Sequence, residues 1–361
     1  MPLDKGSTAL TIFRLEKPLP DDALERFSAK KAIKYDETGL EDETGWVSGR
    51  HLLERRIDDE TSILGGAYNL NMRVTKRVVP PALQRALCRE RELEYMRERS
   101  TDFVPKNVKK EISEFVVEKH IHMIPPALSG VSVAVDRVGD FLFVGTSSGK
   151  ALDMLLTLFY DTFEIDPEKL DFANIASRIP GAEDVTPKVD FSEISSEEDY
   201  IPGRDLLTWL WYRGDNEIFD FTAKDGTEFK AVISGPLTLA MVDPDEGASE
   251  AMIKKGAPER SVEAKSALAI GKKLKKAKLT ISEKDRVWEG GFSADLFNFT
   301  GLKLPATEKG GDADSTFEER MRSLRFLVAA LEAIVEKFIN ELKSDDWDAK
   351  LKEIQAWAAT K

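Results

Sequence analysis

The chain has 361 residues, 42% of them hydrophobic, which is enough for two or three domains with cores of their own. It contains no run of the roughly twenty apolar residues that a membrane helix needs, and its N-terminus lacks the apolar run of a signal peptide. A single cysteine, Cys88, excludes an intrachain disulfide and a cysteine-rich zinc site. We therefore expect a cytoplasmic protein without a membrane partner.

The net charge of −13, taken alone, argues against a nucleic-acid partner, but the charge is unevenly distributed. Residues 254–278 contain nine basic residues and two acidic ones, a local net charge of +7. Acidic residues gather elsewhere, for example at 183–184 and 197–199. This distribution predicts one basic surface on an acidic body.

The first 80 residues predict strands with one short helix. Residues 9–15 predict a strand, and Asp21 or Asp22 can cap a helix that reaches Phe27. Gly45 predicts a turn into a short strand. Residues 69–79 alternate between apolar and polar side chains, which is typical of a half-buried strand.

Two strongly charged helices are predicted next, over residues 82–99 and 105–122. Pro80 and Pro81 preset the first turn of the first helix. Each helix has only a narrow apolar stripe, which favours either a projecting hairpin or a solvated pair with ion pairs four residues apart. A strand pair, a helix and an acidic surface loop then follow, at 131–135 with 140–144, at 150–163 and at 171–200. The first half therefore predicts an α+β fold of antiparallel strands and helices with a helical insertion.

The second half is predicted to begin with a short apolar helix and to continue mainly as strands. Its elements are a helix at 205–212, two or three strands over 219–242 broken at Gly226 and Gly235-Pro236, a loop at 243–247, strands at 272–281 and 288–299, and a linker at 309–312.

The strand at 272–281 gives the clearest chemical signal. Its alternation places Ala277, Leu279 and Ile281 on one face and Lys276 and Lys278 on the other. The two acidic residues nearby are too few to neutralise the local lysines, so we expect these to bind phosphate as point charges. A solvated edge strand protected from aggregation by lysines is the alternative. The candidate DNA-binding residues are Lys254, Lys255, Lys272, Lys273, Lys275, Lys276 and Lys278.

A long helix is predicted near the C-terminus, where Ser315 and Glu318 fit a capping box. Apolar residues recur from Phe317 to Leu342 with alternating spacings of four and three, an unbroken heptad stripe. The stripe predicts either a core helix or an association surface. A second helix bearing Trp347 and Trp357 can fold back over it.

Motifs for catalysis or cofactor binding are weak. The run from Gly145 to Ala151 has one residue too few for a phosphate loop and no Ser or Thr after its lysine. His120 and His122 lie about 200° apart on a helix, with no third ligand. The carboxylates of Asp58, Asp59 and Glu60 could serve a metal-dependent nuclease, but their neighbours show no site pattern. We therefore assign no catalytic residue, metal or cofactor.

Several short stretches resemble the RdgC-type recombination-associated proteins of bacterial nucleoids. The chain as a whole resembles a distant member of that family. The matching stretches are Phe13-Arg14-Leu15, Thr44-Gly45-Trp46-Val47-Ser48, Val79-Pro80, Ile124-Pro125, Leu207-Thr208-Trp209-Leu210, Lys254-Lys255, Ser261-x-Glu263 and Gly271-Lys272. The Gln-Asp-Leu that follows the family's Lys-Lys pair is absent, and the C-terminal region is longer.

This resemblance implies a ring-shaped dimer that encloses duplex DNA without sequence preference and limits the RecA recombinase. It implies a central α+β region at 1–75 and 127–175, a helical tip at 76–126, and a base at 200–361 whose lysines face the hole. The implied partners are DNA, duplex and also single-stranded, a second copy of the chain, and RecA. Because some members have been labelled exonucleases, a metal-dependent DNA exonuclease is the alternative function.

Overall fold

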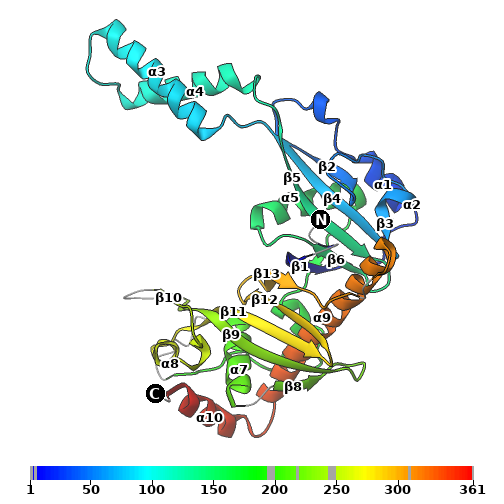
Figure 1. The fold of residues 1–361 in the computed structure, drawn as a ribbon. Helices are drawn as coiled ribbons and strands as arrows, with labels where there is room; N and C mark the ends of the chain where they lie inside the picture. The colour runs from blue at the N-terminus through cyan, green and yellow to red at the C-terminus, as the bar shows by residue number, and fades with distance from the viewer. Residues whose placement is uncertain are drawn as a thin grey trace.

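The computed structural model describes residue 3 and residues 6–192, 200–216, 219–242, 249–307 and 310–359. The fold is α+β, with ten helices and one large antiparallel sheet in the described part (Figure 1). The expected loop at 243–247 and parts of the expected loop at 171–200 and linker at 309–312 lie outside the described residues.

The strands appear in two groups along the chain. They are β1 (Thr8–Arg14), β2 (Glu43–Ser48), β3 (Ile63–Leu64), β4 (Ala67–Lys76), β5 (Ala127–Asp136), β6 (Phe141–Val144), β7 (Glu168–Lys169), β8 (Phe219–Thr222), β9 (Glu228–Ala240), β10 (Glu250–Ile253), β11 (Lys273–Glu283), β12 (Arg286–Ser293) and β13 (Asn298–Lys303).

The helices lie between and after these strands. They are α1 (Ala23–Ala29), α2 (Asp59–Ser62), α3 (Pro81–Arg99), α4 (Lys106–Ile121), α5 (Gly149–Phe163), α6 (Phe172–Ala176), α7 (Pro202–Asn216), α8 (Val262–Ala269), α9 (Ala313–Leu342) and α10 (Trp347–Ala359).

The N-terminal strand β1 joins the two halves of the sheet. Along the sheet the strand order is β10-β9-β11-β12-β13-β1-β6-β5-β4-β2. Thr8 and Leu10 of β1 pair with β13, while residues 11–14 pair with β6. A segment from the start of the chain therefore connects strands that are more than 150 residues apart in sequence.

Two apolar clusters lie against the sheet, and the larger one continues from the β8–β13 half onto Ala67, Ala134 and Phe141 of the other half. In the half built from β2, β4, β5 and β6, helices α1 and α5 cover a cluster that includes Trp46, Phe27 and Phe159. In the other half, α7 and α9 cover a larger cluster that includes Trp209, Trp288 and Phe338. One face of each half is thus occupied by helices.

The strand β4 is buried on both faces, so the expectation of a half-buried strand was wrong. Besides its apolar residues, Asn71, Arg73 and Thr75 are almost fully buried. Arg73 donates hydrogen bonds to the carbonyl oxygens of Ile33 and Leu52, which belong to the segment between α1 and β4. That segment covers the polar face, and its carbonyl groups replace the water that this face would otherwise meet.

The heptad stripe of α9 packs inside the chain's own core. The stripe residues Phe317, Met321, Leu324, Val328, Leu331, Val335, Phe338 and Leu342 are all buried and belong to the larger cluster. The core alternative is therefore confirmed, and the stripe is closed to a second chain. Helix α9 also starts earlier than the expected cap, because Asp312 accepts a hydrogen bond from the Ser315 amide at 2.7 Å.

Helix α10 packs on α8 and α7 in addition to contacting the end of the larger core. Trp357 lies edge-on to Trp211 of α7, with ring centroids 5.1 Å apart.

Two details of the strands also differ from expectation. Gly45 lies within β2, where its backbone approaches the Cα of Ala32 closely, and β9 runs unbroken through Gly235-Pro236.

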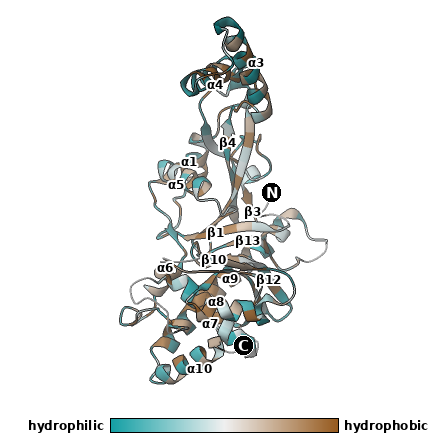
Figure 2. Cartoon of the chain, turned by 90° about the vertical axis from the view of Figure 1, so that its left-hand side faces the viewer, coloured by the Kyte–Doolittle hydropathy of each residue, from teal (hydrophilic) through white to brown (hydrophobic). Residues whose placement is uncertain are grey.

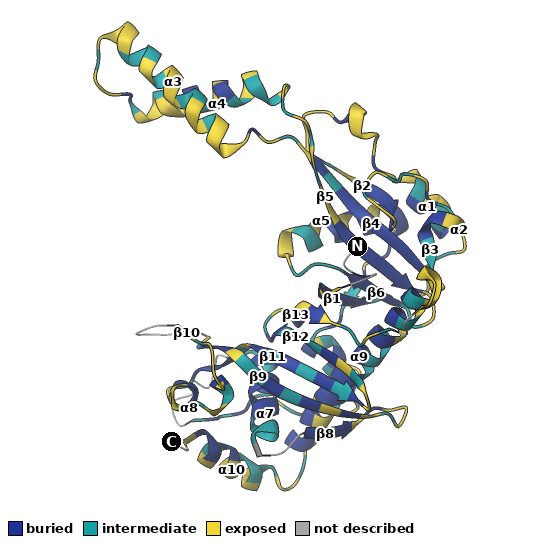
Figure 3. Cartoon of the chain, viewed as in Figure 1, coloured by how far each residue is buried: buried dark blue, intermediate teal, exposed yellow. Residues whose placement is uncertain are grey.

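Helices α3 and α4 lie outside the sheet and pack mainly on each other (Figure 1). Ile112 and Val116 of α4 form a small cluster with Val104. All of α3 is described, and none of its residues is buried; Figure 3 shows the contrast with the buried strands β4 and β5. None of the described helices is long and apolar enough to cross a membrane.

The molecule has the shape of a crescent. In Figure 1, α3 and α4 form its upper end, while β10 and α8 lie at its lower end and extend toward the same side. Figure 2, seen from that open side, shows α7, α8 and α10 gathered below β10 and β12. The other face of these strands is therefore turned toward the middle of the crescent.

Candidate nucleic-acid interface

The face of β9 and β11–β13 opposite the helices carries three rows of side chains that cross the strands. Alternation in β11 buries Ala277, Leu279 and Ile281 in the larger core, so the intervening residues face outward. From β9 to β13 the rows are Thr238, Lys276, Ser293 and Asn298; Ser234, Lys278, Gly291 and Thr300; and Val232, Thr280, Glu289 and Lys303.

These rows form much of a hollow of about 630 Å³, which we call the lysine hollow. Its charged lining residues are Lys254, Lys276, Lys278, Lys303 and Glu289, a net charge of +3. Ser147, from the loop between β6 and α5, lines it as well. Since β13 pairs with β1 and Ser147 follows β6, the hollow lies where the two halves of the sheet meet.

The lysines of the hollow differ in how they are partnered. Lys254 and Lys276 are exposed, and neither makes an ion pair with any other described residue. Lys278 lies 2.8 Å from Glu289, and Lys303 lies 3.4 Å from the same carboxylate. The hydrogen bond from Lys278 lowers the pKa of Glu289 below its ordinary value, so this carboxylate stays ionised at neutral pH. Within the described part of the chain, two of these lysines therefore form no ion pair and the other two share one acid.

Three other predicted lysines are not available to a ligand in the same way. Lys272 and Lys273 are almost fully buried, and the Lys273 ammonium lies 2.6 Å from the buried carboxylate of Asp205. Burial raises the pKa of the Asp205 carboxyl, and the charge of Lys273 opposes that rise. Lys275 forms an ion pair with Glu250. Asp205 of α7 and Glu250 of β10 thus neutralise Lys273 and Lys275, which have too few acidic residues near them in the sequence.

Lys255 is exposed next to Lys254 but does not line the hollow. Lys303, by contrast, was not among the predicted residues. Its sequence neighbourhood carries no cluster of charge, and only the pairing of Glu289 with Lys303 across β12 and β13 brings it beside Lys278. A prediction of strand pairing would have been needed to find it.

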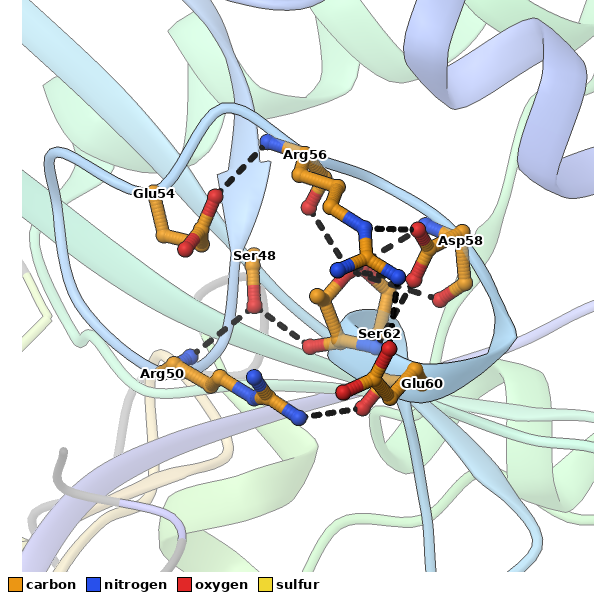
Figure 4. A network of polar contacts seen from close by, with 8 residues as sticks. Ser48, Arg50, Glu54, Arg56, Asp58, Glu60 and Ser62 are labelled. Atoms are coloured by element: carbon orange, nitrogen blue, oxygen red, sulfur yellow. Dashed lines mark hydrogen bonds and ion pairs between the residues drawn. The ribbon is translucent and has the colours of Figure 1, made fainter.

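The carboxylates weighed for a nuclease serve as local structure in α2 (Figure 4). Asp58 caps the helix by accepting a hydrogen bond from the Thr61 amide at 3.0 Å, and it pairs with Arg56. Arg56 also lies 2.6 Å from Glu60. Among the described residues, no group of three or more His, Cys, Asp or Glu side chains is arranged to hold a metal ion.

Neither a scan against protein-family models nor a search of curated proteins gave a match.

Proposed function

We propose that this protein binds DNA without sequence preference through the lysine hollow and the sheet face around it. The observation that carries the proposal is the convergence of four lysines on one hollow: Lys254 from the segment after β10, Lys276 and Lys278 from β11, and Lys303 from β13. Exposed lysines in water contribute little to folding, whereas lysines that displace counterions from DNA contribute strongly to binding. Lysine contacts to phosphate do not read bases, which fits binding without sequence preference.

The crescent shape supports a further proposal, that two chains close into a ring around the DNA and in this way limit the RecA recombinase at the nucleoid. Exposed apolar residues lie at both ends of the crescent. Phe103 and Met123 lie beside α3 and α4, and Val262 and Ile270 lie at the two ends of α8. In this proposal α3 and α4 are the helical tip, and the heptad stripe of α9 takes no part in the contact. Sedimentation at micromolar concentration tests it, since a monomer would contradict a ring of two chains.

The test of DNA binding is the salt dependence of affinity. Each phosphate neutralised contributes about −0.9 to the slope of log affinity against log salt for duplex DNA. Replacing all four hollow lysines with alanine should make the slope shallower by roughly two to four units per chain, to the same extent for any DNA sequence. The fold should persist, because the buried face of β11 is unchanged.

A matched control removes four lysines at the opposite end of the same half of the sheet. Lys224, Lys230, Lys284 and Lys337 are remote from the lysine hollow, and the last three line a different hollow beside β8 and β9. Their replacement by alanine gives the same change in net charge and should leave the slope unchanged. Equal slopes for wild type and the hollow variant would refute the proposed interface.

A further inference from the structure

We infer that the lysine hollow accommodates one nucleotide whose base has left the stack, so that this face engages single-stranded DNA. The inference rests on the proposed DNA binding and adds the form of the ligand. The volume of about 630 Å³ falls in the range of roughly 300–1,000 Å³ that small-ligand sites occupy. A site that bound only phosphate would not require a hollow, because lysines can bind phosphate on an open surface.

Two buried polar atoms in residues that line the hollow have no partner. Ser293 is 5% exposed and Asn298 is 2% exposed, and neither the Ser293 hydroxyl nor the Asn298 side-chain carbonyl has a hydrogen-bond partner in the described structure. They are cross-strand neighbours in β12 and β13. Buried polar groups in proteins are nearly always paired. Both atoms have almost no accessible surface while the hollow is empty, so a ligand would reach them only after the two side chains rotate toward the hollow.

The chemistry of these two groups favours a base over a phosphate. A phosphate diester has no N–H or O–H to donate to the Asn298 oxygen, whereas the edge of a base has donors as well as acceptors. An asparagine amide and a serine hydroxyl can each donate and accept. Together they can form hydrogen bonds with the edge of any base, which agrees with binding that has no sequence preference.

The walls of the hollow supply apolar surface for the face of the base. Met252 and Leu296 line it and are 57% and 47% exposed, and Pro236 lines it as well. Unstacked bases commonly bind between apolar or aromatic side chains, with lysines along the path of the backbone. Lys276 lies in the same cross-strand row as Ser293 and Asn298, so phosphate contacts would lie directly beside the base.

The middle of the three cross-strand rows leaves space in the lysine hollow because Gly291 has no side chain. It stands between Lys278 and Thr300, and a Cβ added there would lie 2.7 Å from the Thr300 hydroxyl, an atom that can rotate away. Gly291→Leu therefore fills the hollow without changing its charge. Thr280→Leu is the matched control, because Thr280 faces outward on β11 but does not line the hollow.

The experiment compares the affinity of the protein for a 20-nucleotide oligothymidylate with its affinity for an abasic strand of the same length. The abasic strand keeps the phosphates and lacks the bases. The full-length wild type should bind the oligothymidylate at least roughly fivefold more tightly than the abasic strand, as expected from the contribution of one stacked base. Gly291→Leu should abolish this ratio and keep the salt slope, while Thr280→Leu should keep both. If Gly291→Leu does not fold, the pair Met252→Ser and Leu296→Ser, which changes only exposed positions, should reduce the ratio.

The outcomes separate the two proposals. Equal affinity of the wild type for both strands, or a ratio that Gly291→Leu leaves unchanged, would overturn the nucleotide site while leaving duplex binding intact. Free thymidine monophosphate that competes as tightly as the oligomer would overturn the assignment to a DNA strand. A wild type that binds neither strand nor duplex would refute the proposed function itself.

Discussion

Helices α3 and α4 and the strand β11 are both densely charged, yet their charges are arranged differently. In the helices, Arg89 pairs with Glu92, Arg91 with Glu94 and Lys110 with Glu114, all three or four residues apart. In β11, successive side chains point to opposite faces, so neighbouring lysines meet different surroundings. A charged residue in a helix can find its ion-pair partner three or four residues away. A charged residue in a strand depends for its partner on the neighbouring strands and on the elements packed against the sheet.

Within β11 this difference divides the lysines into two kinds. Lys273 is buried against Asp205, while Lys276 is exposed and has no ion-pair partner in the described part of the chain. The first serves the fold and the second is available to a ligand. Four predictions, from the largest expected effect to the smallest, test how the partners of a charged residue decide its role in β11 and in the helices.

The largest effect is expected from Lys273→Met. It leaves the Asp205 carboxylate buried without its cation, and breaking a buried pair in this way costs about 3–5 kcal/mol. The free energy of unfolding, measured by urea denaturation, should fall by that amount. Lys276→Met is the matched control and should change it by less than about 0.5 kcal/mol while making the salt slope for DNA shallower. Similar losses of stability in both variants would contradict the division.

A third kind of lysine is Lys265 of α8, which has apolar surroundings. Its ammonium lies 3.2 Å from the centroid of Trp357 and 3.3 Å from Asp215. Burial lowers the pKa of Lys265 to about 8, and Asp215 opposes this shift. The unfolded chain therefore binds more protons than the folded one between about pH 8 and the ordinary lysine value.

Stability should accordingly rise as the pH increases from 7.5 to 9.5 by an amount on the order of 1–3 kcal/mol from this group. Urea denaturation across this range measures the rise, and Lys265→Met should remove that contribution. A wild type and variant with parallel pH profiles would show that Lys265 keeps its ordinary pKa.

Glu289→Gln should strengthen DNA binding. The carboxylate is shared by Lys278 and Lys303, so its removal frees both lysines for phosphate. Because exposed ion pairs are worth about 0.2–1 kcal/mol, affinity should increase roughly two- to fivefold. Fluorescence anisotropy with duplex DNA at fixed salt measures the change. Glu228→Gln, on an exposed position outside the hollow, should have a smaller effect.

The smallest effect is expected in α3. Arg91→Gln breaks an exposed pair with Glu94 within one helix and should leave the free energy of unfolding nearly unchanged. The salt slope for DNA should change by less than about one unit, because the partner glutamate already balances this charge. A decrease in slope as large as that of Lys276→Met would move the interface toward α3 and α4.

Much of the secondary structure was predictable because it depends on local periodicity. Both charged helices and the long helix α9 lie within a few residues of their expected bounds. The alternation in β11 correctly placed Ala277, Leu279 and Ile281 inside. The same alternation does not extend backward, because the register shifts between Leu274 and Lys276, so that Leu274 is buried in the core and Lys275 stays partly exposed.

The sequence by itself thus determined the α+β class, the amphipathic faces of the helices and strands, and the outward direction of Lys276 and Lys278. Only the tertiary structure decided that both faces of β4 are covered, that Asp205 and Glu250 neutralise lysines of β11, and that Lys303, Ser293 and Asn298 meet in one hollow. Neighbours along a helix are fixed by its 3.6-residue turn and can be read from the sequence. Neighbours across a sheet are fixed by the register of strands that lie far apart in the chain, and that register is set only when the whole sheet assembles.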